Sequence, residues 1–330
     1  MRSRLTLGAL LCGLLLAGCG GGDGGKPVRV TIPRGSGLSA AADSLAAHGV
    51  IGWPAGFRLY ARFRGAAARI KPGVYELPAE SSWGAALDKL TSGDVVEVRV
   101  TIPEGWTTRE IAARLAQVTG TPADSALALL ADTAAARRHG VPGPTLEGYL
   151  YPATYVFPLG TPLPEMVRTL VRRYRGSWTP AMRARADSLG MTERQVVTLA
   201  SIVEKEAKVW AERPTISAVY HNRLRIGMRL QADPTVQYAL GSRQSRLLYS
   251  HIRDVADNPY NTYTRAGLPP GPIASPSKGA IEATLAPAAV DYLYFVARPD
   301  GRHVFTRSLA EHNAAKRASA RERAAAQRAR

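Results

Sequence analysis

The sequence predicts an α+β fold in which a small N-terminal α/β module precedes a mainly helical region that contains one β-hairpin. Two observations lead to this prediction. A strand motif occurs twice in the first third of the chain, and helical spacing of apolar residues dominates after it. With 330 residues, the chain is long enough to bury a core and to hold two or three domains.

The repeated motif is VRVTIPRG at Val28–Gly35 and VRVTIPEG at Val98–Gly105, and the copies differ only at Arg34 and Glu104. Valine and isoleucine alternate with polar residues in both copies, which predicts a strand that stops at proline and glycine. A helical pattern follows each copy. After the second copy, Thr107 or Thr108 can cap the helix, because threonine accepts a hydrogen bond from the first turn.

Between the two copies, the pattern predicts a helix over Ala55–Arg64, a strand around Lys71–Leu77 and a helix over Ser82–Leu90. The resulting module covers residues 26–105. Its order of strand, two helices and strand resembles a LysM-type glycan-binding module. A plain structural α/β unit is the alternative, because one fold hosts many functions.

The main domain is predicted over residues 106–310. It is mostly helical, but a loop rich in proline and tyrosine interrupts it at Gly140–Gly160, and Leu293–Val296 with Val304–Thr306 predicts a β-hairpin. The last twenty residues, 311–330, are rich in alanine and carry six basic residues against two acidic ones. We expect a solvated helix there, with contact to acidic headgroups or wall polymer as the alternative.

The N-terminus predicts export. Two arginines precede the mostly apolar stretch Leu5–Ala17, which is shorter than the about 20 residues that span a bilayer. LAGC at Leu16–Cys19 resembles a lipoprotein signal-peptidase site, with Cys19 acylated, and an uncleaved membrane anchor is the alternative. Residues 1–25 then form the signal or anchor and a glycine-rich tether. Both alternatives place the folded part outside the cytoplasm, tethered to a membrane.

The net charge of +17 invites nucleic acid, acidic lipid or an anionic extracellular polymer as a partner. Export argues against nucleic acid. Cys12 and Cys19 both lie in the N-terminal segment, so we expect no disulfide and no cysteine-based metal site in the folded part. The six histidines lack ligand-like spacing, and a glycine-rich phosphate loop is missing. We therefore expect neither a metal nor a cofactor.

The stretch LASIVEKEAKVW contains two glutamates, Glu204 and Glu206, on a predicted helix that a Thr192–Gln195 capping box can start. At 100° per residue, Glu204 lies about 160° from Glu206, where Lys208 is a favourable i+4 partner for a surface ion pair. Apolar residues lie within about 60° of Glu206 on this wheel: Leu199, Ile202, Val203, Val209 and Trp210. Glu206 is therefore predicted to face inward.

Burial disfavours the charged form of a carboxyl group, so Glu206 is expected to have a raised pKa and to be able to act as a general acid. A glutamic acid in an apolar pocket that protonates a glycosidic oxygen is the type case. The alternative is a structural ion pair with a buried arginine, for which the nearby candidates are Arg223, Arg225 and Arg229.

The residues that follow suit a sugar site, which needs amides and hydroxyls for ring hydroxyls and aromatic faces for the C–H side of the ring. The candidate substrate-binding residues are Asn222, Gln231, Asp233, Gln237, Tyr260, Asn261, Thr262 and Tyr263.

Several stretches together resemble the endolytic murein transglycosylases, the MltG or YceG-like family, over residues 28–315. They are LEGYLYPATY (Leu146–Tyr155), ASIVEKE (Ala200–Glu206), NRLRIGMRLQADPTVQYALG (Asn222–Gly241), YNTYTRAGLPPGPIASP (Tyr260–Pro276) and YLYFVA (Tyr292–Ala297). The second glutamate of the family's E-K-E motif is catalytic, and it falls on Glu206, which the helical wheel selects independently.

The resemblance implies a protein of the inner membrane whose catalytic domain faces the periplasm and the cell wall. It would cut nascent peptidoglycan strands internally between N-acetylmuramic acid and N-acetylglucosamine, leave 1,6-anhydro ends and end strand elongation. Peptidoglycan synthases are candidate partners. Family members usually carry a full transmembrane helix, from which the short segment ending at Cys19 departs.

Two further carboxyl groups, those of Glu147 and Asp233, allow functions other than lytic cleavage. Glu147 is interpreted as a loop-ordering or substrate-binding group, and Asp233 as a helix or turn cap. If either lay across the scissile bond from Glu206, a hydrolytic muramidase would be plausible, because hydrolysis uses two carboxylates. A non-catalytic wall-binding protein is the remaining alternative.

Overall fold

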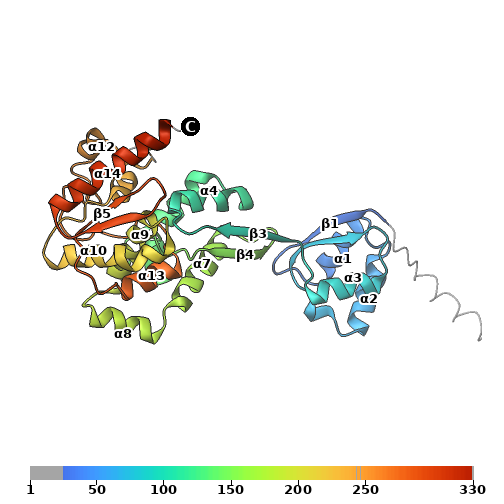
Figure 1. Ribbon diagram of the computed structural model, residues 1–330. Helices are drawn as coiled ribbons and strands as arrows, with labels where there is room; N and C mark the ends of the chain where they lie inside the picture. The colour runs from blue at the N-terminus through green and yellow to red at the C-terminus, as the bar shows by residue number, and fades with distance from the viewer. Residues whose placement is uncertain (1–24, 243, 246, 329–330) are drawn as a thin grey trace, which may run out of the picture. The chain divides into compact units, whose positions relative to one another are not determined.

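The computed structural model describes residues 25–242, 244, 245 and 247–328, and the chain divides into two compact units (Figure 1). The first unit comprises the described residues up to Arg99 together with Val156–Thr161, and the rest forms the second unit. The predicted export signal, nearly all of the glycine-rich tether and Cys19 lie outside the described residues. Helices and small two-stranded sheets together agree with the predicted α+β class.

The first unit has the predicted order of strand, two helices and strand. Its elements are β1 (Pro27–Ile32), α1 (Leu38–Ala47), α2 (Pro54–Phe63), the 3-10 turn η2 (Ala67–Arg69), β2 (Gly73–Pro78) and α3 (Trp83–Ser92). β1 and β2 pair antiparallel, with Val30 opposite Tyr75. Ser82 caps α3 by accepting a hydrogen bond from the backbone of Ala85. The likeness to LysM modules stays a prediction.

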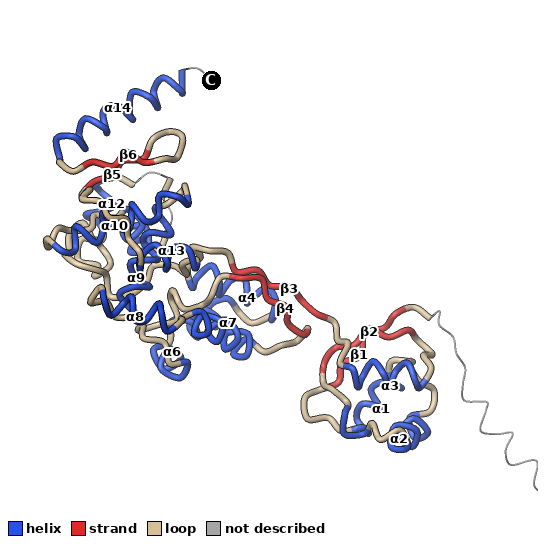
Figure 2. The backbone as a smooth tube through the Cα atoms, turned by 60° about the horizontal axis from the view of Figure 1, so that its bottom comes forward, coloured by secondary structure: helices blue, strands red, loops and turns tan. Residues whose placement is uncertain are grey.

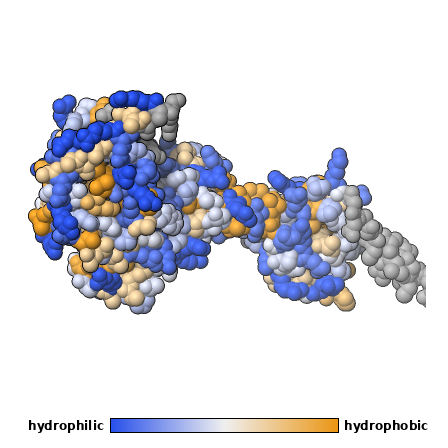
Figure 3. Space-filling view, in the orientation of Figure 1, coloured by the Kyte–Doolittle hydropathy of each residue, from blue (hydrophilic) through white to orange (hydrophobic). Residues whose placement is uncertain are grey.

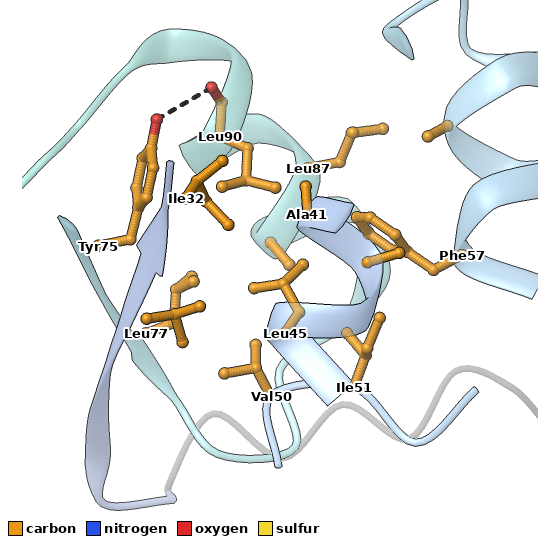
Figure 4. Close-up of a cluster of buried hydrophobic side chains, with 14 of the residues drawn as sticks. Ile32, Ala41, Leu45, Val50, Ile51, Phe57, Tyr75, Leu77, Leu87 and Leu90 are labelled. Atoms are coloured by element: carbon orange, nitrogen blue, oxygen red, sulfur yellow. Dashed lines mark hydrogen bonds between the residues drawn. The ribbon is translucent and has the colours of Figure 1, made fainter. Parts of the chain in front are cut away.

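The alternation in β1 explains the core of the first unit. Val30 and Ile32 are buried while Arg29 and Thr31 are exposed, so one face of the strand packs against the helices (Figure 4). Phe57 of α2 and Leu90 of α3 complete this core, and the hydroxyl of Tyr75 donates to the carbonyl of Leu90 at 3.3 Å. Burying each of these large apolar side chains contributes about 1.5–3 kcal/mol to the free energy of folding.

The second unit is mainly helical, and the division between the units falls within β3 and β4. Its elements are β3 (Glu97–Ile102), α4 (Thr108–Thr119), α5 (Ala123–Ala131), α6 (Thr133–His139), β4 (Ala153–Pro158), α7 (Leu163–Ser177), α8 (Pro180–Ser188), α9 (Glu193–Glu206), η3 (Trp210–Glu212), α10 (Arg213–Arg225), α11 (Asp233–Leu240), α12 (Tyr249–Asp254), α13 (Lys278–Leu285), β5 (Tyr294–Ala297), β6 (His303–Thr306) and α14 (Leu309–Arg328). β4 pairs with β3 and lies within the segment that was predicted to be loop. Within the described ranges, no helix is both long and apolar enough to cross a membrane.

Helix α9 is the central element of the second unit. It contacts α8, α10, α11 and α13, and Figure 2 shows α8, α10 and α13 close to it. Every residue from Val196 to Val203 is buried, as expected for a helix that other elements cover on all sides. The residue that ends α9, Glu206, is therefore held at the end of a rigid core helix.

The predicted hairpin forms from β5 and β6, which pair antiparallel. The C-terminal segment is a helix, as predicted, but α14 packs on this hairpin instead of being solvated all round. The buried hydroxyl of Ser319 donates to the carbonyl of Ala297, and Glu322 pairs with Arg298. On the face shown in Figure 3, mostly hydrophilic side chains cover the region where Figure 1 places α14.

Candidate active site

The capping box predicted for α9 is present. Thr192 accepts a hydrogen bond from the backbone of Gln195, whose side chain accepts one from the backbone of Thr192. The helix ends at Glu206, because Ala207 adopts an extended backbone with ψ 101°. Trp210 therefore lies past the end of the helix and is 66% exposed, so placing it on the apolar face beside Glu206 was wrong.

Glu206 carries the site's most distinctive chemistry. Burial raises the pKa of its carboxyl group from 4.5 to about 7, and the negative charge of Asp233 acts in the same direction. The hydroxyl of Tyr220, on α10, donates to Oε1 at 3.2 Å and, together with the positive charge of Arg223, opposes the rise. A position in the last turn of a helix further disfavours a negative charge. A carboxyl with this pKa can give and take a proton near neutral pH.

Arg223 does not neutralise Glu206 through an ion pair, and none to Glu206 forms among the residues that the structure describes. The buried Arg223 guanidinium instead donates to the carbonyls of Leu293 and Leu230, and it lies 5.4 Å from the ring centre of Tyr294. The structural ion pair that competed with a catalytic role for Glu206 is therefore not formed.

Asp233 is the carboxylate close enough to affect Glu206. It is the first residue of α11, where the helix dipole favours negative charge, and the hydroxyl of Tyr263 donates to its Oδ1 at 2.5 Å. Asp233 does not cap the helix, because Ala232 occupies that position without a side-chain cap, so the predicted capping role was wrong. The two predicted residues Asp233 and Tyr263 are thus brought together beside Glu206.

Gln231 lies just before this carboxylate and has an uncommon backbone conformation. Its φ of 48° is in the left-handed region, which costs roughly 1–2 kcal/mol for a residue with a side chain. Its backbone N–H donates to the carbonyl of Thr262 at 3.1 Å, and its side chain is exposed. Strain of this kind gathers at functional sites, where surrounding contacts maintain it.

Four predicted sugar-binding residues use their polar atoms to order loops: Asn222, Gln237, Asn261 and Thr262. The amides of Asn222 and Asn261 each donate to two backbone carbonyls. Thr262 accepts a hydrogen bond from the backbone of Ala232, and Gln237 makes two bonds to Gln244. Contact between these four residues and a sugar stays a prediction.

Glu147 lies in a second polar cluster. It is 3% exposed, and the backbone and hydroxyl of Thr108 donate to its carboxyl at 3.1 and 2.8 Å. Burial raises its pKa to about 7, against the effect of these bonds and of the hydroxyl of Tyr238. Tyr238 in turn packs against the predicted site residue Tyr260, with ring centres 4.8 Å apart. Of the two roles predicted for Glu147, these contacts support the loop-ordering one.

Glu204 is buried and paired, so its predicted surface ion pair with Lys208 was wrong. Its side chain is 8% exposed and meets the guanidinium of Arg213, 4% exposed, at 2.9 Å. The backbone and hydroxyl of Ser277 also donate to it, at 3.0 and 2.5 Å. The helical wheel failed here because α13, which follows Ser277, covers the side of α9 that the wheel assigned to solvent.

The second copy of the repeat ends beside this ion pair. Lys205 donates to the carbonyl of Gly105 at 3.0 Å, and the backbone of Gly105 donates to the carbonyl of Ser275 at 2.8 Å. Burial and the charge of Glu204 raise the pKa of Glu104, whereas Arg213 lowers it. The position at which the two repeats differ thus lies within the electrostatic reach of Arg213.

Glu206 does not line either of two cavities in the second unit, with volumes of about 1120 and 730 Å³. The smaller one is lined by Asn222 and by residues near the start of α9. In the part of the chain that the structure describes, no group of three or more His, Cys, Asp or Glu side chains is placed to hold a metal ion. The titratable side chains beside Glu206 are those of Tyr220, Asp233 and Tyr263.

Sequence reasoning missed Tyr220 and Arg213, although both have a signal in hindsight. Tyr220 lies on α10 among buried residues, and a buried tyrosine hydroxyl needs a partner. Arg213 begins α10 directly before a proline, and it lies 4.4 Å from the ring centre of Trp210. Neither partner can be identified without knowing how α9 and α10 pack.

Known proteins share this sequence and fold. A model of the YceG-like family matches residues 30–318. The endolytic murein transglycosylase of Bacillus subtilis is 35% identical over 310 residues, covering 89% of this chain and 85% of that protein. The endolytic murein transglycosylase of Streptococcus pneumoniae serotype 2 is 30% identical over 320 residues, which cover 87% of this chain but 57% of the relative.

A crystal structure of a YceG-like protein from Listeria monocytogenes superposes with a TM-score of 0.60 at 32% identity, covering 88% of this chain and 99% of that one. The match of family model, sequence and fold extends over both compact units rather than a single motif. The chain belongs to the YceG-like family.

Proposed function

We propose that this chain is an endolytic lytic transglycosylase, which cleaves β-1,4 bonds between N-acetylmuramic acid and N-acetylglucosamine within peptidoglycan strands. The observation that carries the proposal is Glu206, a carboxyl with a pKa of about 7 and without an ion-pair partner among the described residues. Relatives named endolytic murein transglycosylases support peptidoglycan as the substrate.

In the proposed reaction, protonated Glu206 donates its proton to the bridging oxygen as the bond from that oxygen to C1 of the muramyl sugar breaks. The muramyl C6 hydroxyl then attacks C1 and passes its proton to the Glu206 carboxylate. This closes the 1,6-anhydro ring and restores the acid without consuming water. An intramolecular nucleophile suits this route, because it is already positioned and no water has to be recruited.

The carboxylate of Asp233 supports a second candidate, a hydrolytic muramidase. It lies close enough to raise the pKa of Glu206, and the hydroxyl of Tyr263 fixes its Oδ1. In the lytic route, its negative charge would stabilise positive charge that develops at C1. In a hydrolytic route, it would activate water or form a glycosyl intermediate.

The products distinguish these candidates. Purified enzyme acting on uncrosslinked glycan strands in heavy-oxygen water should give unlabelled 1,6-anhydromuramyl ends, measured by mass spectrometry. Reducing ends that carry the heavy oxygen would overturn the lytic route in favour of hydrolysis. Strands that stay intact under all conditions would favour the non-catalytic wall-binding alternative.

We also propose that the chain is anchored in the cytoplasmic membrane by its N-terminus, through an acylated Cys19, with the catalytic unit facing the cell wall. There it would end the elongation of nascent strands, next to the synthases that make them. The support is the export pattern at Leu5–Ala17 and the lipobox-like Leu16–Cys19. Replacing Cys19 with alanine should abolish labelling by a fatty-acid probe, and an unlabelled wild type would contradict acylation.

A further inference from the structure

The larger of these two cavities, of about 1120 Å³, is lined by residues of α6, α7 and α8 and of the loops beside them. Five arginines line it, Arg138, Arg168, Arg172, Arg175 and Arg183, and we call it the arginine cavity. Its lining includes one carboxylate, Glu193, which accepts a hydrogen bond from the hydroxyl of Tyr174. Positive charge therefore predominates in the lining of the cavity.

Most of this positive charge has no compensation within the described residues. Arg138 pairs with Asp132, and Arg175 donates to the backbone carbonyl of His139. The guanidinium groups of Arg168, Arg172 and Arg183 form no ion pair or hydrogen bond with any residue that the structure describes.

The field of these arginines reaches the cavity wall. Burial lowers the pKa of His139, and the charges of Arg138 and Arg168 lower it further. Arg168 and Arg172 are also like charges one helical turn apart on α7, a spacing that slightly destabilises a helix. The chain thus maintains a repulsive arrangement, which an anion from outside would relieve.

The geometry of the cavity indicates which kind of anion it can bind. Its volume greatly exceeds that of one phosphate or carboxylate group, and the arginines come from three different helices. The lining also includes the apolar side chains of Val171 and Trp178. This suits an extended ligand with several separate anionic groups and apolar parts between them, because each guanidinium can hold a carboxylate with two parallel hydrogen bonds.

We propose that the arginine cavity binds the carboxylate-bearing peptide stems of the glycan strand, and so acts as an acidic-peptide subsite separate from Glu206. The inference rests on the proposed function, because it takes its ligand from the same polymer. Uncrosslinked stems carry several free carboxylates along a short peptide. The separate arginines of the cavity can each bind one of these carboxylates.

The test compares two forms of one polymer. Uncrosslinked glycan strands with intact stems, and the same strands stripped of stems by an amidase, are titrated by calorimetry into the full chain carrying Glu206→Gln, which prevents cleavage. We expect stem-bearing strands to bind at least about fivefold more tightly. Adding Arg168→Gln and Arg172→Gln should abolish that preference without changing affinity for stripped strands.

The matched control replaces two exposed arginines outside the cavity, Arg109→Gln and Arg317→Gln, so that the loss of net charge is the same. This control should keep the preference for stem-bearing strands. All four exchanged arginines are exposed, and thermal unfolding of each variant checks that the fold is intact.

Three results would overturn the inference. Equal affinity for both strand forms would contradict the proposal that the cavity binds peptide stems, but it would not affect the proposed function. A preference that survives in the cavity variant would place the stem contact outside the cavity, and a preference that is lost in the control as well would assign it to overall charge. Equal strand affinity together with cavity-dependent binding to phosphatidylglycerol vesicles would assign the cavity to a membrane surface. Failure of both strand forms to bind the Glu206→Gln chain would count against the proposed function itself.

Discussion

The surroundings of Glu147 and Glu206 raise the pKa of both carboxyl groups to about 7, and burial is the main cause in each case. The two regions nevertheless differ in hydrogen bonding. Glu147 accepts bonds from the backbone and hydroxyl of Thr108, and it is also bonded by Tyr238. Among the described residues, Glu206 accepts a hydrogen bond from Tyr220 alone, and the negative charge of Asp233 acts on it.

This comparison teaches that a shifted pKa alone does not identify a catalytic acid. A carboxyl whose acceptor sites are already filled by the fold orders a loop, whereas one with open acceptor sites is able to meet a substrate. The account assigns the first role to Glu147 and the second to Glu206. The following predictions separate the two roles, beginning with the largest effect.

Glu206→Gln should lower the rate of strand cleavage by at least about 10³-fold, because the amide has nearly the same shape but cannot donate the proton. Thermal unfolding should change little, since Tyr220 can still donate to the amide oxygen. Release of soluble fragments from purified strands measures the rate. Glu147→Gln serves as the matched control and should stay within about tenfold of the wild type. An equal loss of cleavage rate in both variants would contradict the different roles assigned to Glu206 and Glu147.

Replacing Glu204 with glutamine should destabilise the second unit by about 3–5 kcal/mol, because it leaves the buried Arg213 charge without its partner. Although Glu204 lies only two residues from Glu206, any loss of activity in this variant should result from its loss of stability. Denaturant unfolding followed by circular dichroism measures the effect. Lys208→Gln, on an exposed neighbour, is the control and should change stability by less than about 0.5 kcal/mol. An undisturbed Glu204→Gln protein would show that the ion pair is unimportant.

Glu147→Ala should cost about 1–3 kcal/mol of stability, because the buried backbone N–H and hydroxyl of Thr108 lose their acceptor. The pH dependence adds a second readout. A carboxyl whose pKa is raised from 4.5 to about 7 on folding favours the folded state in its protonated form, so this contribution is complete below pH 4.5 and is lost as the pH rises to about 7. Glu147→Gln should flatten that part of the stability profile, and an unchanged slope would contradict the pKa.

Tyr220→Phe should have the smallest effect. The variant removes the hydrogen bond from Tyr220 to Glu206, which opposes the rise of the Glu206 pKa, so that pKa should increase further. Cleavage should slow by only a few fold, in line with about 1 kcal/mol for such a bond. A loss as large as that of Glu206→Gln would mean that Tyr220 itself takes part in proton transfer.

The sequence was sufficient to predict features that depend on local patterns. The Thr192–Gln195 capping box, the hairpin and the inward position of Glu206 follow from residues close together in the chain. The wheel erred on Glu204 because it assumes one covered face, whereas α9 is covered on several sides. It erred on Trp210 because nothing local marked Ala207 as the end of the helix.

The roles of the polar residues could not be predicted in the same way. Asn222, Asn261 and Thr262 have the side chains that a sugar site needs, but distant backbone groups accept or supply their hydrogen bonds. Similarly, β4 forms because β3 offers an edge to the segment 153–158, which by itself reads as loop. Such partners are set by tertiary packing, so a pattern of residue types is not enough to identify them.

The pH dependence of cleavage tests the central claim most directly, because it reports the protonation of the acid itself. For the wild type, kcat/KM should fall as the pH rises through about 7, since the protonated form of Glu206 is required. In Asp233→Asn, which removes the neighbouring negative charge, the fall should move to lower pH, whereas Glu147→Gln should leave it in place. A profile that is flat through pH 7, or that moves with Glu147 and not with Asp233, would contradict the account.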